Sequence, residues 1–295
     1  MAQKKKAGAA PLRRECGAMA AHMLLLEKYP AFRANQMRLE GATARRRDTA
    51  VAEKAKLVTI KTVVNVLYKT PQQNVSDAQI KSQIDVLNRD FRAKNPDRNQ
   101  TPVVWKGLIA DALMQFKVVK VVRRQTTKSS FTTDEGMKKA STGGIAPFSP
   151  QTHLNLWVCP LGGGLLGYAQ FPGGPAATDG VVVNTLAFGT TGTAQAPFNK
   201  GRTGTHEVGH YFNLRHIWGD TPDCSGSDMV ADTPNCAGPN YQSPTGPVVT
   251  CNNGPHGDMW MNYMDYVDDT SMFMFTAQQV LRMRTALATA RSGLT

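Results

Sequence analysis

The run from residue 206 to residue 216, His-Glu-Val-Gly-His-Tyr-Phe-Asn-Leu-Arg-His, constrains the fold and chemistry of this chain more than any other segment. Residues four apart lie one above the other on a helix. His206 and His210 can therefore present two imidazole nitrogens to one metal ion, with Glu207 beside it. The pattern predicts a helix that carries two metal ligands and a carboxylate.

The third histidine, His216, lies six residues beyond His210 and cannot share that face of the helix. The helix must therefore end near Asn213, and the chain must turn back to bring the last imidazole to the metal. Such an exit uses a left-handed backbone, which glycine adopts at the lowest cost and asparagine next. Three neutral imidazoles leave a fourth position for water, as in catalytic zinc sites. A structural zinc site, the alternative, normally closes all four positions, often with cysteine.

Two segments carry a resemblance to the metzincin metalloendopeptidases. The run 206–216 resembles their extended zinc motif, with Asn213 where the motif has glycine. The stretch Met-Asn-Tyr-Met-Asp-Tyr at 261–266 resembles their methionine-containing turn. The resemblance implies that Met264 lies beneath the metal and that Tyr266 ligates zinc or bonds the oxyanion of the transition state.

Within that clan the chain is most similar to the pappalysin or cytophagalysin group, over roughly residues 57–290. The similarity rests on four stretches, at 162–172, 214–220, 228–234 and 272–276. The implied fold is α+β: a twisted mixed sheet and the zinc helix form an upper subdomain, and an irregular lower subdomain ends in a C-terminal helix. The resemblance further implies a proenzyme, with a mainly helical propeptide at 1–56 and a catalytic domain at 57–295.

Local patterns predict where the elements of this fold lie. Alternating apolar residues predict a strand over 57–68. Ser76 and Gln79 form a capping box for an amphipathic helix that ends at Asn95 and Pro96. The remaining elements are expected as strands at about 112–123, 153–159, 166–171 and 180–185, a zinc helix from near Gly201, and a last helix over 276–291.

The net charge of +12 is concentrated in residues 1–60, which hold 13 Lys or Arg against 5 Asp or Glu. These charges are dispersed along an expected helix without interleaved aromatic residues, so a solvated propeptide is favoured over nucleic-acid binding. The sequence has no run of about eighteen apolar residues, which excludes a membrane-spanning helix. No signal-peptide core follows Met1, so we expect a secreted protein whose signal was removed or that is exported by another route.

The cysteines need separate interpretations. Cys159 lies in an apolar strand pattern and is expected to be a buried small hydrophobe. The resemblance implies a disulfide between Cys224 and Cys251 in the loop-rich stretch after the zinc helix. Cys236 is expected to be a free thiol in a surface loop.

Cys16 lies in the sequence Arg-Arg-Glu-Cys-Gly of the expected propeptide, and the family suggests a cysteine switch. In such a switch a thiolate fills the open zinc position and keeps the zymogen latent. Cleavage after Arg45–Arg47 or Lys54–Lys56 would release it. The alternative is an incidental thiol.

Three residues in the loop beyond the zinc helix are candidates for a second cation. Asp228, Asp232 and Thr233 offer oxygen atoms that suit calcium, which the resemblance favours; Asp220 is a weaker candidate. The alternative is that these side chains are solvated or cap turns. The expected cofactors are therefore zinc and calcium.

Substrate-binding residues follow mainly from the resemblance. It makes 165–171 the edge strand of the cleft, so that Gly167, Tyr168 and Ala169 could bind an extended peptide as an added strand; a core strand is the alternative. Related enzymes often cleave before Arg or Lys by means of an acidic residue in the primed-side pocket. Thr270 stands at that position here, with acidic residues at 268 and 269 close by.

These features predict a secreted zinc endopeptidase that acts on proteins or peptides and is kept latent by its own propeptide. Zinc would polarise the scissile carbonyl and lower the pKa of its bound water to roughly 7. Glu207 would take the proton of that water and pass it to the leaving amine, and Tyr266 would bond the oxyanion. The competing class is a non-catalytic, metal-stabilised binding or adhesive module, which would need neither residue.

Overall fold

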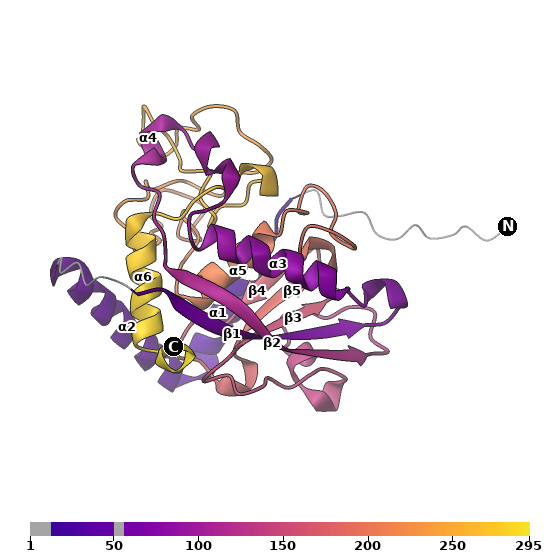
Figure 1. Ribbon diagram of the computed structural model, residues 1–295. Helices are drawn as coiled ribbons and strands as arrows, with labels where there is room; N and C mark the ends of the chain where they lie inside the picture. Colours follow the sequence, from indigo (N-terminus) through magenta and orange to yellow (C-terminus); the bar gives the residue numbers. More distant parts are fainter. Residues whose placement is uncertain (1–12, 50–55) are drawn as a thin grey trace.

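Figure 1 shows the computed structural model, which describes residues 13–49 and 56–295. Its centre is a five-stranded mixed sheet of order β2-β1-β3-β5-β4. Four strands run parallel, and β4 pairs antiparallel with β5 at one edge. This is the expected α+β fold. The strands are β1 (Val58–Tyr68), β2 (Met114–Gln125), β3 (Leu154–Cys159), β4 (Gly167–Ala169) and β5 (Val181–Asn184).

The two faces of the sheet are covered by different helices. Alternate strand residues point to opposite sides, so Leu156 and Val183 pack with α3 and α5, whereas Trp157 and Val182 pack with α1. Within the described residues, none of the helices is long and apolar enough to cross a membrane. The helices are α1 (Ala18–Lys28), α2 (Pro30–Thr49), α3 (Asp77–Asp90), α4 (Val103–Lys106), α5 (Arg202–Tyr211) and α6 (Ala277–Ala288).

Helix α3 begins where the sequence predicts but is capped by only half of the expected box. The Ser76 hydroxyl accepts a hydrogen bond from the Gln79 amide at 3.1 Å. The Gln79 side chain does not return to Ser76; its Nε2 donates instead to the Phe188 carbonyl at 2.8 Å. A tertiary contact thus replaces the local one. The helix also ends earlier than expected, at Asp90.

The segment between α5 and α6 is irregular, as expected for the second subdomain; it lies at the top of Figure 1. The sulfur atoms of Cys224 and Cys251 lie 2.12 Å apart and close a loop with a separation of 27 residues. Cys159 is buried on β3, as predicted. The prediction of a surface thiol at Cys236 is wrong, because this side chain is fully buried and belongs to the same apolar core as Trp260.

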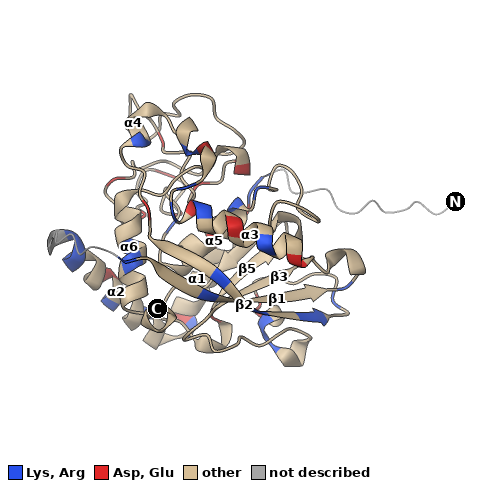
Figure 2. Cartoon of the chain, in the orientation of Figure 1, with Lys and Arg blue, Asp and Glu red and all other residues tan. Residues whose placement is uncertain are grey.

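The segment 13–49 packs against the rest of the protein through both of its helices. Helix α1 packs beside β4, and α2 runs along α6 (Figure 1). Phe32 and Leu39 of α2 are buried, while basic residues of α2 lie on its outer side (Figure 2). Gln36 Nε2 donates to the Pro172 carbonyl at 2.6 Å, just beyond β4. The segment is therefore docked through specific contacts at both helices.

One ion pair joins α2 to α6. The Arg282 guanidinium contacts both carboxylate oxygens of Glu40, at 2.7 Å for Nη1, and its Nε donates to the Asn213 carbonyl at 2.6 Å. The Arg282 side chain is 1% exposed and that of Glu40 25%. Arg282 thus links α2 to the turn that leads into His216.

Replacing Glu40 with glutamine should lower the unfolding free energy of the full-length protein by about 2 kcal/mol. The reason is that a buried guanidinium loses its counter-charge, although solvent reaching Glu40 moderates the cost. Urea unfolding would measure the change. As a control, Asp85→Asn breaks the exposed pair with Lys81, which should cost at most about 0.5 kcal/mol. Equal effects of the two variants would contradict the prediction.

Candidate active site

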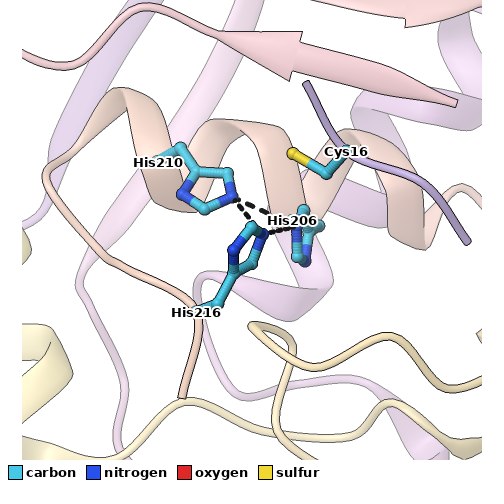
Figure 3. Close-up of side chains that lie close together, drawn as sticks. All are labelled: Cys16, His206, His210 and His216. Atoms are coloured by element: carbon cyan, nitrogen blue, oxygen red, sulfur yellow. Dashed lines mark hydrogen bonds between the residues drawn. The ribbon is translucent and has the colours of Figure 1, made fainter. Parts of the chain in front are cut away.

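Three imidazoles meet at the surface of α5 (Figure 3). The Nε2 atoms of His206 and His210 lie 3.1 Å apart, and that of His216 lies 3.2 Å and 3.1 Å from them. All three side chains are buried. Four ligands about 2.0–2.1 Å from a tetrahedral zinc ion are separated by roughly 3.3–3.4 Å. The trio therefore has the spacing that such an ion requires.

The turn after α5 brings His216 back to the other two rings. Asn213 has φ of 77°, the left-handed conformation that the sequence predicts at this position. The Leu214 amide donates to the Gly209 carbonyl at 3.0 Å and closes the helix. A Cβ on Gly209 would lie 2.5 Å from Met264 Sδ. Glycine at 209 thus allows Met264 to pack directly against the helix.

Each imidazole is oriented by a hydrogen bond at its other nitrogen. The Nδ1 atoms of His206 and His210 lie 2.7 Å and 2.8 Å from the carbonyls of Tyr263 and Leu214. These carbonyls only accept, so both Nδ1 atoms carry the proton and both Nε2 atoms keep a lone pair. Burial, followed by the neighbouring imidazoles, holds the pKa of His206 and His210 well below the usual range. The three Nε2 lone pairs point toward one another and repel. A bound cation would replace this repulsion with attraction.

His216 has a carboxylate at the corresponding position. Its Nδ1 lies 2.6 Å from Asp220 Oδ1, and the Trp218 ring stacks on it with centroids 4.4 Å apart. From the sequence Asp220 is only a weaker candidate for calcium, and its contact with His216 is seen only in the structure. The signal was the spacing of four residues between His216 and Asp220.

Glu207 and Cys16 lie together at the open side of the three histidines. Cys16 Sγ is 3.4 Å from Glu207 Oε2, and its ligand atom and those of the histidines lie within 4.8 Å of one another. Burial raises the pKa of Glu207 to about 8, an effect that the Cys16 hydrogen bond and the Arg14 charge reduce. Burial also raises the pKa of the Cys16 thiol, and Glu207 adds to it.

Tyr266 closes the site opposite the edge strand. Its hydroxyl oxygen accepts a hydrogen bond from the Cys16 amide at 3.3 Å, and its ring packs against His216 and Trp218. The Met264 amide donates to Asn262 Oδ1 at 3.0 Å, which fixes the turn beneath the histidines. The structure therefore places the Tyr266 ring beside His216 and packs Met264 against the helix at Gly209.

The strand β4 lies at the edge of the sheet. The side of β4 that faces away from β5 is paired with the segment before α1. The Gly17 amide donates to the Gly167 carbonyl, and the Leu166 amide donates to the Glu15 carbonyl, both at 2.9 Å. A Cβ on Gly167 would come within 2.8 Å of the Glu207 side chain. Glycine at 167 thus lets an added strand and Glu207 share the cleft. Tyr168 and Ala169, the other strand residues named from the sequence, are buried.

A buried pocket next to the histidines holds Arg14. Its Nη2 donates to Asp269 Oδ1 at 2.7 Å, and its Nη1 donates to Thr203 Oγ1 at 2.9 Å. The Val267 carbonyl accepts from Nε and Nη2 at 3.3 Å, and the guanidinium lies 5.1 Å from the centre of the Phe198 ring. Arg14 is 1% exposed. Neither Arg14 nor Thr203 is predicted from the sequence to lie at this site.

Thr270 lies outside this pocket. Its side chain is exposed, and its hydroxyl is 3.3 Å from Ser243 Oγ. The acid that contacts the buried guanidinium is Asp269, which also accepts hydrogen bonds from the amides of Lys200 and Arg202. Asp269 therefore joins the pocket to the start of α5.

The three calcium candidates are only partly brought together. Thr233 Oγ1 donates to Asp228 Oδ2 at 2.7 Å, and burial raises the pKa of Asp228 to about 7. Asp232 instead accepts hydrogen bonds from the Thr276 hydroxyl and the Gln278 amide at the start of α6. Calcium stays a prediction for Asp228 and Thr233.

Comparison with known proteins gives consistent matches. The profile of the family described as pregnancy-associated plasma protein-A, peptidase family M43, matches residues 162–288. An extracellular metalloprotease of Arthroderma benhamiae is 32% identical over 254 residues, which cover 83% of each chain. One from Pyricularia oryzae is 34% identical over 254 residues, 82% of this chain and 80% of the relative.

Solved structures match the same region and extend to the N-terminal segment. Mature mirolysin of Tannerella forsythia, in complex with a cleaved peptide, is 43% identical with a TM-score of 0.79; the match covers 81% of this chain and 96% of that one. A promirolysin variant is 38% identical with a TM-score of 0.85, covering 95% and 97%. The fold and site define a metallopeptidase of the metzincin type, in its proenzyme form. The chain belongs to the pappalysin family of these enzymes.

Proposed function

We propose that this protein is a secreted zinc endopeptidase made as a latent zymogen, with a propeptide at 1–56 and a catalytic domain at 57–295. The observation that carries the proposal is the convergence of three Nε2 atoms with Cys16 Sγ, which itself lies 3.4 Å from the Glu207 carboxylate. Imidazole ligands with one open position suit zinc. Secretion is supported by the fungal relatives, which are named extracellular metalloproteases.

The residues around the site fit peptide hydrolysis. Zinc held by His206, His210 and His216 would polarise the scissile carbonyl and acidify a water molecule. Glu207 Oε2 would take a proton from the attacking water and deliver it to the leaving amine. The Tyr266 hydroxyl donates a hydrogen bond to the oxyanion as the carbonyl carbon becomes tetrahedral. The free edge of β4, including Gly167, Tyr168 and Ala169, aligns an extended peptide through main-chain hydrogen bonds.

Latency in this proposal comes from the segment 13–17. Cys16 Sγ would fill the fourth position on zinc in place of water, and a thiol bound to zinc loses its proton. The same segment takes up the β4 edge through Glu15 and Gly17. A substrate and the propeptide therefore compete for one cleft.

The Arg14 pocket supports a preference for substrates with a basic side chain next to the cleaved bond. Thr203 and Val267, which line the pocket, lie close in sequence to His206 and Tyr266. Removal of the propeptide would take the Arg14 guanidinium away from Asp269 Oδ1, and a cationic side chain of a substrate can replace this charge-assisted contact. Asp269 would therefore supply the acidic side chain that related enzymes have at the position of Thr270.

Replacing Asp269 with asparagine should reduce the preference for arginine over norleucine at that substrate position by about 30-fold or more. This corresponds to the 2 kcal/mol or more lost when a buried charge pair loses one partner. Asparagine keeps an oxygen for the amides of Lys200 and Arg202, so α5 keeps its start. Values of kcat/KM for paired peptides measure the ratio. Asp268→Asn, which changes the adjacent half-buried acid, is the matched control and should retain the preference.

The proposed function is tested on the full-length protein after activation by limited proteolysis. A peptide library is incubated with and without a chelator, and zinc is then restored. We expect cleavage that stops with the chelator and returns with zinc. Cleavage that persists in chelator would refute a zinc mechanism. Zinc binding without any cleavage would favour the non-catalytic module.

A further inference from the structure

The segment before Cys16 presents two consecutive arginines to the cleft, and each contacts a different side chain of the catalytic domain. Arg14 is enclosed by the Asp269 pocket. Arg13 is exposed, and its guanidinium carbon lies 4.8 Å from the centre of the Tyr241 ring. A cation at this distance over an aromatic face is attracted by the ring quadrupole. Tyr241 is not part of the pocket around Arg14, so it makes a second, separate contact.

Tyr241 is held in place by both of its neighbours in the chain. The backbone and side-chain amides of Asn240 each donate to the Asp265 carboxylate at 2.8 Å. On the other side, the Gln242 carbonyl accepts from the Asp268 amide at 2.8 Å. The partners in these bonds, Asp265 and Asp268, lie on either side of Tyr266 and before Asp269. The Tyr241 ring is therefore fixed to the same segment that lines the Arg14 pocket.

The ring is positioned between the catalytic residues and solvent. Its centroid lies 6.1 Å from that of Tyr266, and the side chain is half-buried. An aromatic ring held rigidly at a cleft loses little conformational entropy when a side chain stacks on it. Adjacent residues of an extended peptide point to opposite sides, which is how Arg13 and Arg14 reach two receptors at once.

We propose that the activated cleft recognises two consecutive basic residues in a substrate, one in the Asp269 pocket and one on the Tyr241 ring. This inference rests on the proposed function and adds Tyr241 as a specificity-determining residue. The prosegment runs parallel to β4. A substrate could run in the same direction as this segment or in the opposite one. Two consecutive basic residues read the same in both directions, so either orientation puts one basic residue at each position.

The test uses the full-length protein after limited proteolysis and peptides that differ at two adjacent positions. The pairs are Arg-Arg, Arg-norleucine and norleucine-Arg. We expect kcat/KM for Arg-Arg to exceed that of the better single-arginine peptide about two- to five-fold, as an exposed cation–π contact predicts, and mainly through a lower KM. Tyr241→Phe should keep this ratio and Tyr241→Leu should bring it close to one. Tyr68→Leu, at the end of β1, is the matched control and should keep the ratio.

Two results would overturn the inference. One is a Tyr241→Leu variant in which kcat/KM for Arg-Arg still exceeds that of the better single-arginine peptide by the same factor. The other is a single-arginine peptide that is cleaved as well as Arg-Arg by the parent protein. Failure of the proposed function looks different, since no peptide would then be cleaved by any variant. In that case the same peptides, labelled for fluorescence anisotropy, still test the ring. Tighter binding of Arg-Arg that depends on Tyr241 would support dibasic recognition, and binding that does not depend on it would refute it.

Discussion

Replacing Glu207 with alanine is expected to lower kcat/KM of the activated protein by about 10²–10⁴-fold, the range for loss of a positioned general base. The upper end is expected because one carboxylate serves both the attacking water and the leaving amine. Zinc content should stay near one per chain. The Nδ1 hydrogen bonds that orient His206, His210 and His216 do not involve Glu207.

The measurement pairs peptide kinetics with metal analysis of the same samples. Asp85→Asn, an exposed carboxylate on α3, controls for a change of charge and should leave both values unaltered. Activity within a few-fold of the parent would remove Glu207 from the mechanism. Loss of zinc together with activity would make Glu207 a structural support of the metal site.

The core of this site could be predicted because its signals are local. Helical periodicity puts His206 and His210 on one face, and the cost of a left-handed residue singles out Asn213. Both depend on a few neighbouring residues, so both are visible in the sequence. The prediction of a full capping box at Ser76 was wrong for the opposite reason. The Gln79 side chain bonds the Phe188 carbonyl, 109 residues away, and local sequence patterns do not include such a contact.

The pocket that holds Arg14 could not be predicted, for a related reason. Arg14 and Asp269 are separated by 255 positions, and neither lies in a motif that defines its partner. Thr270 stands where related enzymes have the acidic residue, so that position gives no indication of the pocket. Asp269 is visible in the sequence only as one of two acids beside it. Burial of Cys236 was missed in the same way, since its loop has no periodicity that would separate a core position from a surface one.

Replacing Cys16 with serine is expected to make the unprocessed full-length protein active. Ligation by four groups contributes about 10–16 kcal/mol in structural zinc sites, so one thiolate is worth well above the 1.4 kcal/mol that equals a tenfold change. We therefore expect at least about a tenfold rise in activity before any cleavage. With cobalt in place of zinc, the sulfur-to-metal absorption band should be present in the parent and absent from the variant.

Latency should be weakened by Cys16→Ser and not abolished, because two other contacts still hold the segment. Arg14 remains in the Asp269 pocket, and Glu40 remains paired with Arg282. Arg14→Ala combined with Cys16→Ser should therefore raise the activity of the uncleaved chain beyond either single change. Cys236→Ala, a buried thiol elsewhere, is the control and should stay latent. A Cys16→Ser protein as latent as the parent would show that occupancy of the cleft alone, without the sulfur, silences the enzyme.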